Sequence, residues 1–220
     1  MITATINNIQ VEVPEGTTIL WAAKKANVNI PTLCFHPDLK PGGQCGVCVV
    51  EIEGIPGLSR SCVTPLGEGF RVRTHSPKVM NARKEIVEMI LANHDTDCLT
   101  CIKNNSCELQ GLAATLGIST VEYAKLAERL PIDRSSVSIV RDPNKCILCG
   151  RCIQVCSNVQ TVNALAVNHR GYDTVIGTAF SAGLGNSVCI NCGQCVVHCP
   201  VGALYENSQV EAVWEALHDP

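Results

Sequence analysis

Side chains that build large hydrophobic cores are scarce in this sequence. Only three Phe, two Trp and three Tyr occur among its 220 residues. No apolar run approaches the roughly 18 residues that a membrane-spanning helix needs. The opening residues, MITATINNIQVEVPEG, contain neither the basic segment nor the unbroken apolar segment of a secretion signal. We therefore expect a cytoplasmic protein without a membrane span.

Motifs that would let the chain carry out catalysis by itself are also absent. The sequence shows no serine–histidine–acid set, no phosphate-binding loop and no G-x-G-x-x-G after a predicted strand. We expect no catalytic residues among these side chains, and we expect any nucleotide to bind a partner.

Cysteine, by contrast, is abundant, with 15 residues. Small modules with little core need a staple, and disulfides, zinc and iron–sulfur clusters are the three candidates. A reducing cytoplasm disfavours disulfides, and an odd number of thiols cannot all pair. The cysteine-rich spacings are therefore interpreted as metal sites.

Two cysteine runs repeat one spacing. Residues 146–156 read CILCGRCIQVC and residues 189–199 read CINCGQCVVHC, both C-x2-C-x2-C-x3-C and offset by 43 residues (189 − 146). In two-cluster ferredoxins the last cysteine of each run ligates the other cluster. The runs predict one 4Fe-4S cluster on Cys146, Cys149, Cys152 and Cys199, and a second on Cys189, Cys192, Cys195 and Cys156. Zinc, which prefers separated C-x2-C pairs, is the alternative.

The residues beside these cysteines follow the ferredoxin pattern with one departure. Gly150 and Gly193 stand inside the loops, where the backbone must pass close to a cluster. Pro200 follows the second run, but Ser157 takes the equivalent place after the first. We expect this departure to weaken one turn without removing a ligand.

A further cysteine set lies near the N-terminus. Cys34, Cys45, Cys48 and Cys62 have the spacing C-x10-C-x2-C-x13-C. Plant-type two-iron ferredoxins have C-x4-C-x2-C and a distant fourth cysteine, so the first gap is longer here. A 2Fe-2S cluster still fits, because the glycine-rich loop PGGQCGVC can point amide N–H groups at sulfur. Zinc remains the alternative at these four cysteines.

Three cysteines then remain, one ligand short of a third 4Fe-4S cluster. Cys98, Cys101 and Cys107 follow His94 in the pattern H-x3-C-x2-C-x5-C. Imidazole is a competent iron ligand, so His94 would bring the count to 16 ligands for four clusters. His36 and His198 also lie beside cysteines, and counting alone does not choose among the six histidines. His94 is preferred because it ends a predicted helix and the three thiols follow closely.

The remaining pattern indicates an α+β chain of small modules. Strands are predicted at 2–6, 11–13, 47–52 and 70–74, and helices at 17–28, at 77–93 after the N-cap Ser76, and from about 106 to 116. A weaker helical pattern covers 120–129. A hairpin turning at Arg170-Gly171 is predicted between the two runs, and the tail 208–220 begins as an amphipathic helix that should pack on another surface.

The charge of the chain favours a basic docking partner. The formal net charge is −3, and thiolate-bound clusters would make it more negative. We expect docking to positively charged surfaces and no binding to nucleic acid. Lys145 and Arg151, beside the first run, are predicted to be solvated charges, with tuning of a cluster or contact with a partner as the alternatives.

These motifs resemble one family. The N-terminal spacing resembles the β-grasp ferredoxin domain of complex I's large iron–sulfur subunit and of FeFe hydrogenases, and the His94 segment resembles the family's one-histidine, three-cysteine motif. The order of the three parts is similar to that in both groups and in some NAD-linked formate dehydrogenases. The stretches RDPNKCILCGRC, NHRGYDTVIG and NCGQCVVHCPVGALYENSQVEAVWEALHDP are most similar to the hydrogenases.

The resemblance implies a division into modules. It implies a 2Fe-2S ferredoxin-like β-grasp domain at 1–76, a histidine-ligated 4Fe-4S module at 77–118, a connector at 119–140, a bacterial-type double 4Fe-4S ferredoxin domain at 141–209, and a C-terminal helix at 210–220 that leads to an absent hydrogen-activating domain.

The implied function is an electron-transfer relay of one 2Fe-2S and three 4Fe-4S clusters. The relay would connect the hydrogen-activating centre of an FeFe hydrogenase to a flavin subunit that handles NAD(P)H, or to a soluble ferredoxin. The alternative is an electron-transfer part of a formate dehydrogenase or of a complex I-like oxidoreductase. All 15 cysteines are assigned, so we expect a truncated or separately expressed relay portion of an oxidoreductase. A naturally short electron-transfer subunit is the other possibility.

Overall fold

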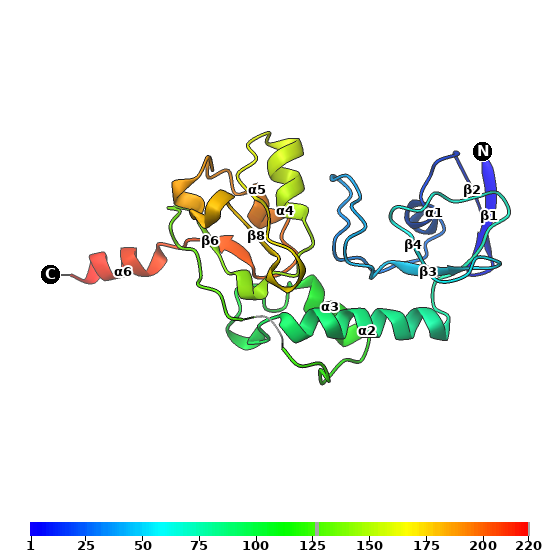
Figure 1. The fold of residues 1–220 in the computed structure, drawn as a ribbon, viewed down its shortest axis with the longest axis horizontal. Coiled ribbons are helices and arrows are strands. Elements are labelled where there is room, and N and C mark those ends of the chain that lie inside the picture. The colour runs from blue at the N-terminus through cyan, green and yellow to red at the C-terminus, as the bar shows by residue number, and fades with distance from the viewer. Residues whose placement is uncertain (126–127, 220) are drawn as a thin grey trace.

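The computed structural model describes residues 1–125 and 128–219 (Figure 1). Its N-terminal part is a five-stranded sheet with the order β2-β1-β5-β3-β4. The strands are β1 (Ile2–Ile6), β2 (Ile9–Val13), β3 (Val49–Ile52), β4 (Ser59–Arg60) and β5 (Arg71–Arg73). β1 and β5 are parallel, whereas the other neighbours are antiparallel.

Local sequence explains how this sheet is built. Asn7 and Asn8 both have positive φ in the turn between β1 and β2, a conformation that asparagine tolerates well. Alternate side chains of the hairpin are buried, so one face packs inward. Helix α1 (Ile19–Lys25) begins after Thr18, whose hydroxyl accepts a hydrogen bond from the Trp21 N–H (3.4 Å). Its apolar side chains complete the core of this domain.

Two helices connect the sheet to the rest of the molecule. Helix α2 (Pro77–Asn93) begins after the N-cap Ser76, as predicted, and α3 (Glu108–Thr115) follows. α2 is anchored to the sheet by the buried Arg83, which donates to the carbonyls of Val47 (3.1 Å) and Val49 (2.8 Å). α3 is held to the C-terminal part, since the Glu108 N–H donates to the Pro200 carbonyl (3.0 Å).

The C-terminal part carries both cysteine runs. β6 (Ile139–Arg141) pairs antiparallel with β9 (Leu204–Glu206), and the predicted hairpin consists of β7 (Ala166–Asn168) and β8 (Val175–Gly177). The short helices α4 (Arg151–Gln154) and α5 (Gln194–Val197) begin directly after the glycines of the two runs, Gly150 and Gly193. Short 3-10 helices cover Cys98–Thr100, Pro143–Lys145, Gly171–Asp173, Ala179–Ser181 and Leu184–Asn186, and a π-helix covers Val155–Val159.

One predicted helix needs correction, and the helical part of a second prediction is confirmed. Residues 120–125 and 128–129 are not helical, and residues 126–127 of that predicted helix lie outside the described part. The tail does form α6 (Val210–His218), but none of its residues is buried, and it projects away from the body (Figure 1). The expected packing surface for α6 is therefore not supplied by the described residues. Among those residues, no helix is long and apolar enough to cross a membrane.

Candidate metal centres

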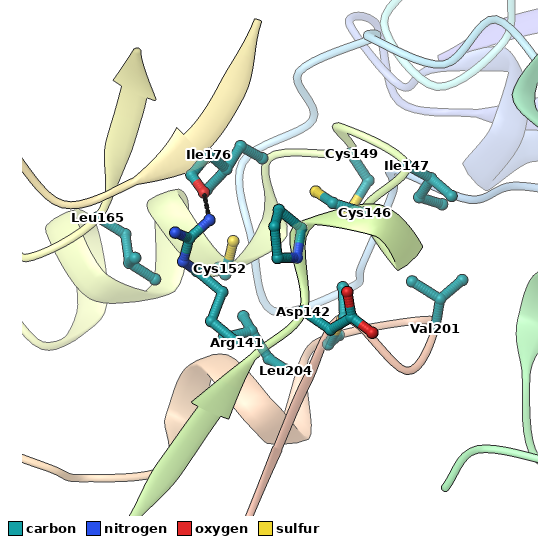
Figure 2. Close-up of a pocket in the computed structure, with 13 residues that line it drawn as sticks. Arg141, Asp142, Cys146, Ile147, Cys149, Cys152, Leu165, Ile176, Val201 and Leu204 are labelled. Atoms are coloured by element: carbon teal, nitrogen blue, oxygen red, sulfur yellow. Dashed lines mark hydrogen bonds between the residues drawn. The ribbon is translucent and has the colours of Figure 1, made fainter. Parts of the chain in front are cut away.

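The cysteines of the two runs line two separate cavities. One cavity is lined by Cys146, Cys149, Cys152 and Cys199. The other is lined by Cys156, Cys189, Cys192 and Cys195. Each cavity thus receives three thiols from one run and the last thiol of the other. Figure 2 shows Cys146, Cys149 and Cys152 among the residues around the first cavity.

The two runs adopt the same backbone conformation. Leu148 (φ 54°) and Asn191 (φ 58°) occupy equivalent positions in the left-handed region, and Gly150 (φ 75°) and Gly193 (φ 73°) do so two residues later. Each glycine then starts a short helix. The repeat in sequence is therefore a repeat in structure, and glycine adopts this φ without strain.

The runs differ at their ends, where their sequences differ. α5 ends at Val197 ahead of Pro200, which cannot continue a helix. After α4, in contrast, the chain continues through Cys156 and Ser157 as the π-helix Val155–Val159. The serine thus replaces a tight turn by an extra helical turn. The Cys156 thiol still lines the second cavity.

Burial opposes ionisation of the thiols in these cavities. It raises the pKa of Cys146 to about 11 and those of Cys149 and Cys195 to about 12. Such thiols become thiolates only when a bound cation compensates for the lost hydration, and metal binding then releases their protons. The donor set therefore suits an iron-containing group with substantial positive charge.

The spacing of the sulfur atoms argues against zinc at these sites. Four thiolates at about 2.3 Å from one zinc ion would lie within about 4 Å of one another. Among the described residues, only one trio of His, Cys or acidic side chains brings all its ligand atoms within 4.8 Å, and that trio is His36, Asp38 and His198. No three thiols of either cavity form such a compact group among the described residues.

The N-terminal thiols form a tight and largely buried group. Cys34, Cys48 and Cys62 are at most 4% exposed, and the sulfurs of Cys48 and Cys62 are 3.3 Å apart. A hydrogen bond from the Cys45 thiol lowers the pKa of Cys34 to about 2, while the pKa of Cys45 is raised. The Gln44 and Cys45 backbone N–H groups also donate to Cys34. The glycine-rich loop therefore points amides at sulfur, which favours thiolate ligands.

The third thiol set lies beside the first cavity. Cys98, Cys101 and Cys107 lie near one another, since their mutual repulsion adds to burial in raising the pKa of Cys98. A Cβ on Gly202 would be 2.7 Å from the Cys101 Sγ, so this glycine leaves room for the sulfur. His94 caps the C-terminus of α2, and its Nδ1 is buried without a hydrogen-bond partner among the described residues. An unpaired imidazole nitrogen with a lone pair suits a metal ligand.

The other two candidate histidines lie elsewhere. His36 and His198 face each other, with ring centroids 4.7 Å apart. They meet at the contact between the N-terminal domain and α5, and they form their own trio with Asp38. Proximity to a cysteine in sequence is therefore a poor guide to which thiols a histidine joins in space.

Two cations act differently from the sequence-based prediction. Arg151 is buried rather than solvated, because it forms a bidentate ion pair with Glu108 (2.7 and 2.8 Å) and donates to the Phe35 carbonyl (2.8 Å). Lys145 is also largely covered and lies 3.9 Å from an Asp142 oxygen. The pattern of charges along the chain carried no sign of these tertiary partners.

One cation was not singled out from the sequence. Arg141, at the end of β6, lines the first cavity and donates to the Ile176 carbonyl (2.8 Å), as Figure 2 shows. Its Nε is buried without a hydrogen-bond partner among the described residues. The positive charge of the guanidinium opposes the rise in the pKa of Cys146, so it stabilises negative charge in this cavity. The position of Arg141 shortly before the run is the only sequence feature that could have identified it.

Comparison with protein families matches three models in order along the chain. Residues 1–77 match a 2Fe-2S iron-sulfur cluster binding domain. Residues 83–122 match an NADH-ubiquinone oxidoreductase-G iron-sulfur binding region, and residues 136–205 match the ferredoxin-like domain of NADH-quinone oxidoreductase subunit 3. Binding domains for 2Fe-2S and 4Fe-4S clusters are therefore present.

A solved structure matches nearly the whole chain. It is described as an NAD+-reducing [NiFe]-hydrogenase in the H2-reduced state, with a TM-score of 0.87 and 32% identity. The match covers 94% of this chain and 88% of the other. The chain belongs to this family of iron–sulfur oxidoreductase subunits. The family also includes the complex I 78 kDa subunit, which is 32% identical in Neurospora crassa over 91% of this chain.

Longer relatives contain this region as one part. An NADP-reducing hydrogenase subunit of Solidesulfovibrio fructosivorans is 43% identical over the full chain. An NADPH-Fe(3+) oxidoreductase subunit alpha of Geobacter sulfurreducens is 39% identical over 93% of it. The chain spans 38% and 24% of these two relatives, respectively.

Proposed function

We propose that this chain is an electron-transfer relay between an NAD(P)H- or ferredoxin-linked partner and the hydrogen-activating centre of an FeFe hydrogenase. The main support for this proposal is that eight thiols line two cavities. Each run gives its last thiol, Cys156 or Cys199, to the cavity of the other run. Such an exchange is the arrangement of two-cluster ferredoxins. The order of the three matched family models supports the same reading.

We assign four clusters to sixteen side chains. The 2Fe-2S cluster would be held by Cys34, Cys45, Cys48 and Cys62, and the histidine-ligated 4Fe-4S cluster by His94, Cys98, Cys101 and Cys107. The remaining two 4Fe-4S clusters would be held by Cys146, Cys149, Cys152 and Cys199, and by Cys189, Cys192, Cys195 and Cys156. When bound, each cluster accepts or donates one electron at a time.

The protein's own residues set the environment of these sites. Leu165, Ile176 and Leu204 give the first cavity an apolar wall that excludes water. The Leu148 N–H donates to Cys146, and the Ala164 N–H lies 3.3 Å from the Cys156 Sγ. Amide donors and the Arg141 charge both stabilise added negative charge. The chain thus tunes its sites by hydrogen bonding, charge and burial.

The hydrogenase assignment rests on similarity along the whole chain. The hydrogenase relative is 43% identical over all of it, against 38% and 32% for two complex I-type relatives. The match covers 88% of the solved relative, so that relative is itself a short chain. A short electron-transfer subunit is therefore the second candidate. A formate dehydrogenase or complex I-like enzyme is the further alternative. We propose a cytoplasmic location and a partner that handles NAD(P)H through a flavin, or a soluble ferredoxin.

Iron analysis tests the relay. Anaerobically prepared protein should contain about 14 irons per chain (2 + 4 + 4 + 4), with matching labile sulfide. Cys156→Ser and His94→Ala should each reduce iron by up to about four atoms, in different clusters that spin resonance distinguishes after reduction. Folded, colourless protein containing zinc would exclude the proposal. Hydrogen uptake or evolution by the isolated chain would exclude the relay-only assignment.

A further inference from the structure

A group of metal-binding side chains lies apart from the sixteen assigned ligands. His36, Asp38 and His198 bring one ligand atom each within 4.8 Å of one another, the sole trio to do so in the described ranges. His36 and Asp38 belong to the loop after Cys34, whereas His198 ends α5. The group therefore joins the N-terminal domain to the double-repeat domain.

His198 is already oriented as a metal ligand. Its Nδ1 lies 2.9 Å from the Gln194 carbonyl oxygen, one helical turn earlier, so Nδ1 carries the proton in this contact. The lone pair is then on Nε2. Histidines that bind metal ions commonly donate their other ring N–H to a backbone carbonyl, which fixes the tautomer and the ring orientation. The contact with Gln194 therefore holds the ring in the form that ligates.

The partner residues complete an open site. His36 is half-buried, its Nδ1 accepts a hydrogen bond from the Asp38 backbone N–H (3.3 Å), and the same nitrogen lies 3.6 Å from the Asp38 carboxylate. The Asp38 side chain is 78% exposed, so water can reach the remaining coordination positions. The nearby cation Arg151 is paired with Glu108 and does not leave an uncompensated positive charge beside the group.

We propose that His36, Asp38 and His198 form a binding site for a divalent cation of the zinc class. Two imidazoles and one carboxylate suit zinc, with water as the fourth ligand. Exposure of Asp38 gives an exchangeable site rather than a closed structural one. The bound ion ties the 36–38 loop to the end of α5, and places a positive charge close to Cys34 and Cys199.

Zinc binding to the cluster-loaded chain tests this proposal. The protein is freed of adventitious metal, dialysed anaerobically against zinc chloride, and analysed for zinc and iron together, so that zinc replacing iron is identified. We expect one zinc per chain with iron unchanged. His36→Ala and His198→Ala should each weaken zinc binding by at least about 10–100-fold. Loss of a residue that only hydrogen-bonds to a metal ligand already lowers metal affinity by that factor. Asp38→Asn should weaken it less, and the exposed His169→Ala serves as the matched control.

A second measurement separates the site from damage to neighbouring clusters. Amide hydrogen exchange in residues 36–40 should slow when zinc binds the parent protein and the His169→Ala variant. Exchange should not change on addition of zinc to the His36→Ala variant. Because His36 lies two residues from the proposed cluster ligand Cys34, this variant is first checked for full iron content. Zinc binding that is equal in the parent and all three site variants would overturn the proposal. So would the absence of zinc binding to the iron-replete parent at about 100 μM zinc.

Discussion

The Arg151–Glu108 ion pair joins three modules, and its removal gives a quantitative test of the structure. Arg151 lies in α4, Glu108 begins α3, and the Phe35 carbonyl belongs to the N-terminal domain. The Arg151 side chain is 4% exposed, whereas that of Glu108 is 44% exposed. Substitution Glu108→Gln keeps the shape but leaves the buried guanidinium with a neutral partner.

The size of the effect follows from this unequal burial. Breaking a fully buried pair by removing one partner costs about 3–5 kcal/mol, and breaking an exposed pair costs about 0–1 kcal/mol. A half-exposed carboxylate on a buried cation falls between, at about 2 kcal/mol. With an m value of about 2 kcal/mol/M, the urea midpoint should fall by about 1 M.

A double-mutant cycle isolates the pair. Arg151→Met removes the cation while keeping its apolar stem, and in that background Glu108→Gln should cost less than about 0.5 kcal/mol, because no buried charge remains. Unfolding is followed anaerobically by circular dichroism and by cluster absorbance, whose transitions must coincide for free energies to be compared. Additive effects of the two substitutions would refute the buried pair as the connection between modules.

Three further substitutions test the assigned sites. His94→Cys adds one negative charge to its cluster and should lower the midpoint potential if the cluster assembles; a redox titration showing a rise would contradict ligation by His94. Gly202→Ala places a Cβ 2.7 Å from the Cys101 Sγ and should destabilise that module by about 1–3 kcal/mol, seen as lower iron retention on dilution. Arg141→Gln should lower the potential of the cluster next to Cys146, and an unchanged potential would remove Arg141 from its environment.

Local sequence rules predicted much of the fold correctly. Ser76 followed by Pro77 predicted the start of α2 correctly, because a cap and a pre-set φ act within one turn. The hairpin around Arg170-Gly171 was also predicted, although its turn contains a short 3-10 segment at Gly171–Asp173. The weak pattern at 120–129 failed over the residues that the structure describes. A few apolar residues at helical spacing do not form a helix without a surface to cover.

Contacts between modules could not be predicted in this way. The pairing of Arg151 with Glu108 and the meeting of His36 with His198 join segments more than 40 and 160 residues apart, respectively. Nothing in the local spacing of these residues encodes their partners, so a solvated charge and an ordinary loop histidine were reasonable expectations. Only the three-dimensional packing shows that both connect domains.

The exchange of the last thiols makes the double-repeat domain a single unit. Cys156 leaves its own run to line the cavity of the second, and Cys199 does the reverse. A truncation within the loop between the runs would therefore deprive both cavities of a thiol, rather than leave one intact half. The β6–β9 pair has the same consequence, because β6 precedes the first run and β9 follows the second. Each half contributes a strand and a thiol to the other, so we expect the two proposed clusters to assemble together.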